Sequence, residues 1–158
     1  MKVWIIYDSK FGHCKKLAET LEDLLEGDCD LSVGFAKKIS PNDVLEESPE
    51  AVLVGGPIHF GKPSRVISSW VKGCYKLTRS LGLRVGKTGA FTTRDSTSGV
   101  EIQWQQLFLK YPFAAKIFPQ VLAVKLVSKS GALTLELNSH VYEIIEDLRH
   151  FLLQKSII

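Results

Sequence analysis

Short, continuously apolar runs alternate along this chain with segments whose apolar residues recur every three to four positions. Lys2–Tyr7 and Ala51–Gly55 are apolar almost throughout, which is typical of strands buried on both faces of a sheet. Between them, Cys14–Glu26 places its leucines on one helical face and is followed by Gly27, a common helix stop. Because strands buried on both faces need helices on both sides, this alternation constrains the fold more than any other feature.

The alternation continues to the end of the chain. Further strands are predicted at Leu31–Phe35, Leu83–Thr92 and Val121–Val127. Further helices are predicted at Pro41–Glu47, Val66–Cys74, Val100–Phe108 and Val141–Leu152, the last capped by Asn138 or Ser139. We therefore expect an α/β fold: a three-layer α/β/α sandwich around a five-stranded parallel sheet of order 2-1-3-4-5.

In a sheet of this order, ligands bind outside the carboxyl ends of the strands, where the strand order reverses. The reversal falls between the first and third strands. The candidate site therefore comprises the loops that follow Tyr7, Gly55 and Thr92.

Size and composition are ordinary for one globular domain spanning residues 1–158. No apolar run is long enough to cross a membrane and no signal peptide is recognisable, so a cytoplasmic location is expected. The net charge of +3 comes without a basic block interleaved with aromatic residues, so nucleic acid is not an expected partner. The three cysteines form no CxxC pair, which predicts reduced thiols and no metal site.

The first candidate loop, Asp8–Cys14, joins a buried strand directly to a helix. Its backbone amides and the helix N-terminus favour an anion, Ser9 can donate a hydrogen bond, and Gly12 permits close backbone approach. An ordinary strand-to-helix turn remains the alternative. The loop matches neither GxGxxG nor GxxxxGK[ST], so neither a dinucleotide-binding nor a P-loop fingerprint is present.

The segment Ile6–Ala18 resembles the opening of the flavodoxin family, whose S/T-x-T/Y-G-x-T pattern wraps the phosphate of FMN. The resemblance implies that the phosphate is held by Ser9, Lys10, Phe11, Gly12, His13 and Cys14. Three of these positions depart from the family. His13 stands where Asn is common. Phe11 stands where Thr or Tyr is usual and Cys14 where Thr is usual, so these two departures each remove a hydroxyl donor.

The second loop, Gly55–Pro63, resembles the GSP-x-Y-F-G-N segment of flavodoxins and of the related quinone reductases. In those proteins it borders the isoalloxazine ring, which implies ring contacts from Pro57, Ile58, His59, Phe60 and Gly61. His59 or Phe60 is the candidate for stacking on the ring. The alternative is that Phe60 fills the core and His59 is simply exposed.

The third loop, Thr92–Gly99, is rich in Ser, Thr and Gly. By resemblance it lies at the polar edge of the flavin, with contacts from Thr92, Thr93 and Arg94. Arg94 either stabilises negative charge near the reduced flavin or pairs with Asp95. Cys14 is not expected to act as a phosphatase-type nucleophile, because no arginine follows it at the required spacing.

The resemblance implies an FMN-binding electron-transfer protein with no catalytic acid, base or nucleophile. Its partner would be an iron–sulfur protein or another flavoprotein, and the basic net charge of the chain favours an acidic one. Two alternatives remain. One is an NAD(P)H-dependent quinone or FMN reductase on the same fold, and the other is a binding module that no longer holds FMN tightly.

Overall fold

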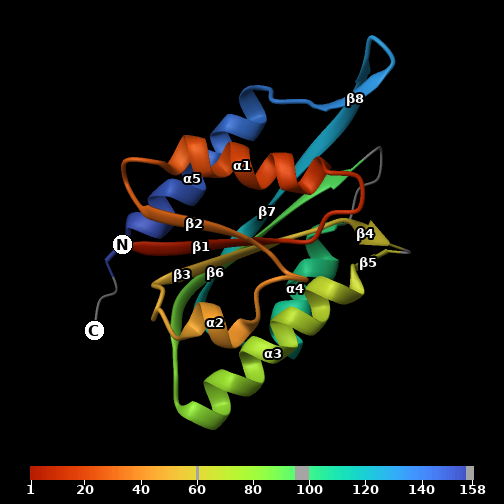
Figure 1. Ribbon diagram of the computed structural model, residues 1–158. Helices are drawn as coiled ribbons and strands as arrows, with labels where there is room; N and C mark the ends of the chain where they lie inside the picture. Colours follow the sequence, from red (N-terminus) through yellow and green to blue (C-terminus); the bar gives the residue numbers. More distant parts are fainter. Residues whose placement is uncertain (60, 95–99, 156–158) are drawn as a thin grey trace.

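The structure, a computed structural model, describes residues 1–59, 61–94 and 100–155, with only the backbone of His59. The strands are β1 (Lys2–Tyr7), β2 (Asp30–Phe35), β3 (Ala51–Gly55), β4 (Ile58–His59), β5 (Lys62–Pro63), β6 (Val85–Arg94), β7 (Ala114–Lys129) and β8 (Ala132–Leu135). The helices are α1 (His13–Leu25), α2 (Pro41–Leu45), α3 (Arg65–Leu81), α4 (Val100–Lys110) and α5 (Ser139–Leu153). They form three layers, with the sheet in the middle (Figure 1).

The main sheet has the order β2-β1-β3-β6-β7-β8. Its first five strands are parallel, and in chain order they follow the predicted 2-1-3-4-5 arrangement, which is confirmed. The predicted count of five strands is wrong by one, because β8 adds an antiparallel strand beside β7. Ser130 and Gly131 connect these two strands with positive φ at both positions, as a tight hairpin with the twist of a sheet requires.

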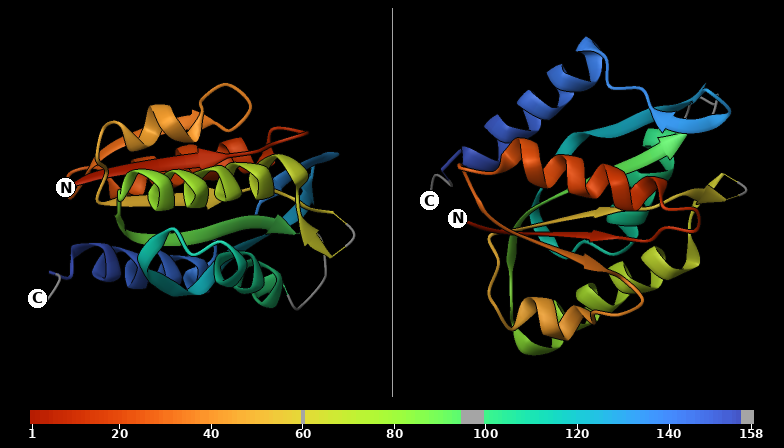
Figure 2. Two further views of the ribbon diagram at one scale, coloured as in Figure 1. Left: turned by 90° about the horizontal axis from the view of Figure 1, so that it is seen from below. Right: turned by 45° about the horizontal axis from the view of Figure 1, so that its top comes forward.

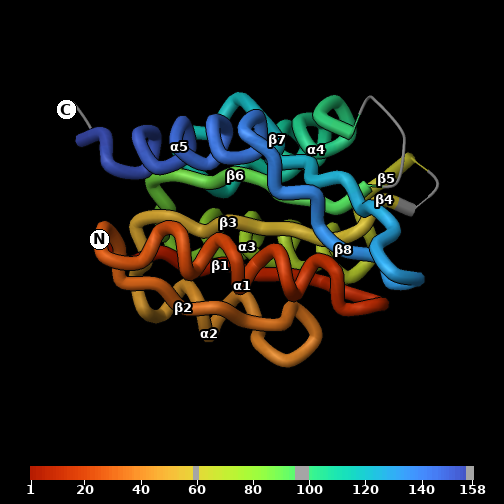
Figure 3. The backbone as a smooth tube through the Cα atoms, turned by 90° about the horizontal axis from the view of Figure 1, so that it is seen from above, coloured from red at the N-terminus to blue at the C-terminus, as the bar shows by residue number. Residues whose placement is uncertain are grey.

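Two apolar cores lie on opposite faces of the sheet, as expected for strands buried on both sides. Val3 and Ile5 of β1 face the core shared with α1 and α5, whereas Trp4 and Ile6 face the core shared with α2, α3 and α4. Figure 3 shows α1 and α5 on one face, and the left view of Figure 2 shows α2 and α3 on the other. No helix in the described part of the chain is both long and apolar enough to cross a membrane.

Strand β7 begins at Ala114, seven residues before the predicted strand. The register between β6 and β7 shifts between Thr88 and Ala90. This irregularity interrupts the regular apolar pattern of the strand, so the sequence did not predict the additional residues. Pro119 lies in the part of β7 that absorbs this irregularity. Since proline has no N–H to donate to a neighbouring strand, a bulge is where a sheet tolerates it.

Three helices begin at a side chain that accepts a backbone N–H. Ser40 caps α2 in a reciprocal capping box with Asp43, Ser64 caps α3, and Asn138 caps α5. The predicted cap at Asn138 is confirmed. Helix α1 begins differently, and this difference lies within the candidate site.

Candidate functional site

Hydrogen bonds connect the carboxyl ends of β1, β3 and β6, where the candidate loops begin. The Asp8 N–H donates to the Gly55 carbonyl over 2.8 Å, and the Gly56 N–H donates to the Phe91 carbonyl over 3.3 Å. The buried Thr92 hydroxyl donates to the Gly56 carbonyl over 2.7 Å. The structure therefore brings the starts of the three loops to one edge of the sheet (Figure 1).

The first loop turns sharply into α1. The Gly12 N–H donates to Ser9 Oγ over 2.9 Å, and Gly12 has a φ of 86°. An L side chain rarely adopts that backbone conformation, which explains the glycine at this position. The Ser9 oxygen is the acceptor in this bond, so the bond itself does not use the Ser9 hydroxyl proton.

Gly12 is the N-cap residue of α1, and no described side chain caps this helix start. The first N–H groups of a helix have no acceptor within the helix, so those of α1 require acceptors from outside it. The first turn contains no acidic residue, and Lys15 and Lys16 are exposed next to it. An uncapped helix start with neighbouring lysines favours a negatively charged group.

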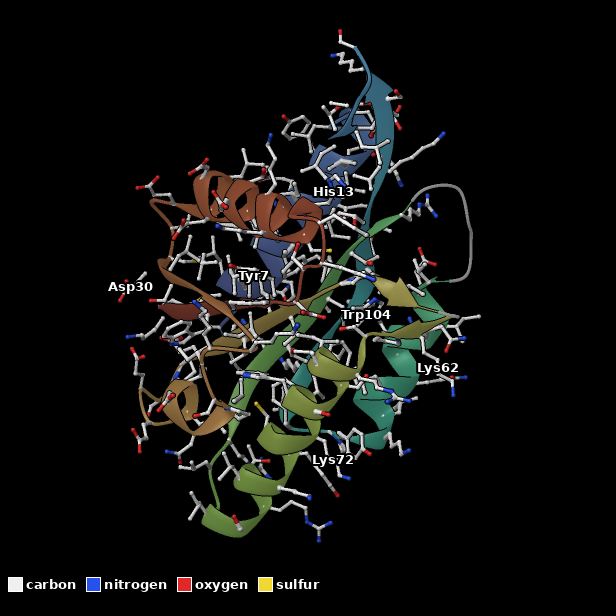
Figure 4. The ribbon with its side chains drawn as sticks, turned by 45° about the vertical axis from the view of Figure 1, so that its right-hand side comes forward. Tyr7, His13, Asp30, Lys62, Lys72 and Trp104 are labelled. Carbon is white, nitrogen blue, oxygen red and sulfur yellow. The ribbon has the colours of Figure 1, made fainter. Side chains whose placement is uncertain are left out.

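Phe11 and Lys10 form the outer rim of the first loop. The Phe11 side chain is 77 % exposed, and the Lys10 ammonium lies 5.5 Å from its ring centroid. Phe11 therefore contributes little to the core and no hydrogen-bond donor to the loop. His13, the first residue of α1, is half-buried at the start of the helix (Figure 4).

Cys14 links the start of α1 to the end of β6. Its side chain is 2 % exposed, and its Sγ lies 3.4 Å from Thr93 Oγ1. Burial raises the pKa of the Cys14 thiol, with a smaller opposing effect from Thr93. A neutral thiol is a weak hydrogen-bonding group, so Cys14 contributes at most a weak donor at this position.

Asp8 and Ser64 form a buried hydrogen-bonded pair beneath the candidate loops, and the sequence did not predict it. The Ser64 hydroxyl donates to Asp8 Oδ2 over 2.6 Å, and Asp8 and Ser64 are 7 % and 4 % exposed. Ser64 Oγ also accepts the Ile67 N–H, so the same oxygen caps α3. This pair joins the end of β1 to the start of α3. The signals were an acidic residue directly after a buried strand and a serine directly before a helix.

The second loop contains a small hairpin that the sequence analysis did not predict. Ile58 pairs with Pro63, and the backbone of His59 pairs with Lys62 in antiparallel fashion. Gly61 has a φ of 74° at the turn, and Pro57 and Ile58 are half-buried. The right view of Figure 2 shows this hairpin at the same end of the sheet as the start of α1. The expectations for Phe60 and for the His59 side chain lie outside the described residues.

The third loop begins later than predicted, because β6 continues to Arg94 instead of ending at Thr92. Thr92 is fully buried, and Thr93 and Arg94 are half-buried at the end of the strand. The predicted loop residues 95–99, including the proposed Asp95 partner of Arg94, lie outside the described residues. The structure thus places Thr92, Thr93 and Arg94 at the same edge of the sheet as the first loop.

The donor set of the first loop suits a phosphate group. It consists of backbone N–H groups at an uncapped helix start, the Ser9 hydroxyl and nearby lysines. Phe11 and Cys14 stand at two positions where the flavodoxin pattern has hydroxyl side chains. The Phe11 side chain donates no hydrogen bond, and the Cys14 thiol is only a weak donor. The residues present therefore fit the phosphate of FMN with a reduced number of strong donors.

No protein-family model and no curated protein matched the sequence. Solved structures did match over nearly the whole chain. A mutant form of the flavodoxin from Pseudomonas aeruginosa has a TM-score of 0.66 and 20 % identity, over 96 % of this chain and 99 % of that chain. A flavodoxin, WrbA-like protein from Agrobacterium tumefaciens has a TM-score of 0.65 and 18 % identity, over 96 % and 92 %.

Rubredoxin oxygen:oxidoreductase from Desulfovibrio gigas has a TM-score of 0.69 and 20 % identity over 96 % of this chain. The chain spans only 36 % of the length of that oxidoreductase. These similarities show that the chain has a flavodoxin-like fold. At such low identity they show the fold alone.

Proposed function

We propose that this chain binds FMN at the carboxyl ends of β1, β3 and β6 and transfers electrons through it. The observation that carries the proposal is the start of α1, which no described side chain caps, set among three loops at the switch point of a flavodoxin-like sheet. When bound, FMN supplies the redox chemistry, and the protein supplies binding, orientation and electrostatics.

In this proposal the chain holds FMN at two ends. The N–H groups at the start of α1 and the Ser9 hydroxyl bind the phosphate, with Lys10 adding positive potential. Pro57, Ile58, His59, Phe60 and Gly61 border the isoalloxazine ring. Thr92, Thr93 and Arg94 lie at its polar edge, where the arginine charge stabilises a reduced, negatively charged ring.

A flavin-dependent reductase is the second candidate. The structures that match this chain include one named as an oxidoreductase, so the fold also occurs within a larger oxidoreductase. Steady-state oxidation of NAD(P)H with a quinone by the FMN-loaded protein would favour this function. Absence of such turnover, together with fast electron exchange with a protein partner, would favour the carrier.

The proposal is tested by titrating FMN into the purified protein and following flavin fluorescence. We expect a dissociation constant below about 1 μM for the unchanged protein. Gly12→Asp should weaken binding by about 100-fold or more, because it places a side chain at positive φ and a carboxylate beside the phosphate.

Gly82→Asp is a matched control for this titration. Gly82 also has positive φ, with nothing within 4 Å of its missing Cβ, but it lies at the far end of α3. This variant should lose some stability and retain its affinity for FMN. Absence of FMN binding at about millimolar concentration would contradict the proposal. That result would favour a binding module that does not hold FMN.

A further inference from the structure

Charge is distributed unevenly along this chain and on its surface. Residues 51–94 contain eight of its 20 Lys and Arg residues and none of its 17 Asp and Glu residues. Helix α3 lies within this stretch, and Arg65, Lys72, Lys76 and Arg79 are all exposed on it. Figure 4 shows Lys72 on α3 and Lys62 by the β4–β5 hairpin. Every charged residue on the exposed side of α3 is therefore basic.

An open groove of about 620 Å³ lies beside the first turns of α3. Its walls are the loop after β2, the start of α2 and the first residues of α3. Lys37, Lys38 and Arg65 are its basic residues, and Asp43 is the single acidic residue among those that line it. The groove thus carries a positive charge, and its apolar lining comes from residues such as Val66 and Trp70.

Packing holds both walls of the groove in place. The Trp70 indole N–H donates to the Ile39 carbonyl over 2.8 Å, which fixes the loop against α3. A Cβ added at Gly73 would lie 2.9 Å from Pro41 Cγ, so α2 approaches α3 closely because residue 73 is glycine. A surface held in this way can bind a partner without first being ordered.

The groove lies next to the candidate flavin site. Helix α3 begins two residues after the β4–β5 hairpin, and its capping residue Ser64 is bonded to Asp8 in the first loop. Arg65, at the rim of the groove, directly follows Ser64. A partner seated on the groove would therefore contact the same edge of the protein as the proposed flavin ring.

We propose that an acidic protein surface docks on this basic face, defined as Lys37, Lys38, Lys62, Arg65 and Lys72. The inference rests on the proposed function, since the docked protein would be the partner in electron transfer. Opposite charge across an interface increases the association rate and orients the partner, which a carrier that must bind briefly requires.

The observations favour a protein over a membrane or a nucleic acid. Membrane-binding faces combine basic residues with large apolar side chains that are exposed. Among the described residues, no exposed large apolar side chain lies within residues 36–40 or 61–72. Single-strand binding needs exposed aromatic residues between the cations, and Trp70 is buried. A groove with apolar walls and a cationic rim suits side chains of a folded acidic partner.

The test is an NMR titration of the isotopically labelled full chain with an acidic [2Fe–2S] ferredoxin. We expect amide shifts to cluster at residues 36–40 and 62–72 and to disappear at high salt. The triple variant Lys37→Glu, Lys38→Glu, Arg65→Glu should bind about 30-fold more weakly. The control variant Lys110→Glu, Lys116→Glu, Lys129→Glu makes the same charge change at exposed positions on α4 and β7 and should bind within about threefold of the unchanged protein.

This readout does not require flavin, so it separates the two proposals. A protein that takes up no FMN but binds ferredoxin through the basic face would fail the proposed function and retain the docking surface. Shifts that are absent or lie elsewhere, or equal losses in both triple variants, would overturn the docking proposal. Preferential binding of a DNA duplex or of anionic lipid vesicles at these residues would also overturn it.

Discussion

At the residue scale, single side chains determine which hydrogen-bond donors the first loop offers to the proposed phosphate. Ser9 and Gly12 shape the turn through one hydrogen bond, and the positive φ of Gly12 leads into an uncapped helix. Phe11 is the largest departure from the flavodoxin pattern, yet its side chain is mostly exposed and takes little part in the core. Its effect should therefore appear in ligand affinity rather than in stability.

Replacing Phe11 by threonine tests this separation. Phe11→Thr restores a hydroxyl donor, and a hydrogen bond to a charged group contributes about 1.5 kcal/mol or more, so FMN should bind about tenfold more tightly. Phe11→Ala is the control, with no gain in affinity expected. Fluorescence titration measures both variants. Equal affinities for the threonine and alanine variants would show that residue 11 makes no contact with the phosphate.

The buried Asp8–Ser64 pair should be important for stability. Ser64→Ala removes the cap of α3 and leaves a buried carboxylate without its donor, which together should lower the free energy of unfolding by about 2–3 kcal/mol. Ser40→Ala removes an exposed cap from the short helix α2 and should cost about 1 kcal/mol or less. Urea denaturation compares the two variants, and similar losses would contradict this role of the buried pair.

The loop residues around the proposed phosphate site were identifiable from the sequence, because they are consecutive and follow a recognisable strand. The Asp8–Ser64 pair was not, because its members are 56 positions apart and meet only when β1 and α3 are packed. The contact of Cys14 with Thr93 was hidden for the same reason, at a separation of 79 positions. Contacts between distant residues depend on the tertiary arrangement, which local patterns do not encode.

Among whole elements, β1 and β3 were predicted with the bounds that the structure has. Both are central strands, with β3 buried throughout and β1 buried from Val3 to Ile6, so their apolar runs are continuous and end at polar or glycine residues. The short elements β4, β5 and β8 were missed, because segments of two to four residues are too short to show a period. The Ser-Gly turn before β8 was the available signal for a hairpin.

Packing between β3 and β6 explains the glycine at the end of β3. Gly55 pairs with Phe91, and a Cβ added at residue 55 would lie 2.2 Å from the Phe91 ring. Gly55→Ala should therefore lower the free energy of unfolding by about 2 kcal/mol. Gly56→Ala, whose Cβ would lie 3.3 Å from Asp8 Cβ, should cost less than about 1 kcal/mol. Equal midpoints of urea denaturation for the two variants would contradict this explanation.

At the scale of the whole molecule, strand order determines where function can lie. The order β2-β1-β3-β6-β7 reverses between β1 and β3, so the loops after these strands diverge to opposite faces and leave room for a ligand. This order followed from the alternation of strands and helices together with right-handed crossovers. The concentration of basic residues on α3 became a surface feature only once the fold had placed Lys37 and Lys38 beside that helix.

The affinity of the protein for FMN compared with its affinity for riboflavin measures whether the first loop binds a phosphate. Riboflavin carries the same ring without the phosphate, so the difference reports the contribution of the α1 start and Ser9. If these groups bind the phosphate, FMN should bind at submicromolar concentration and riboflavin about 100-fold more weakly, equivalent to about two charge-assisted hydrogen bonds. Equal affinities, or no binding of either flavin at about millimolar concentration, would contradict the account.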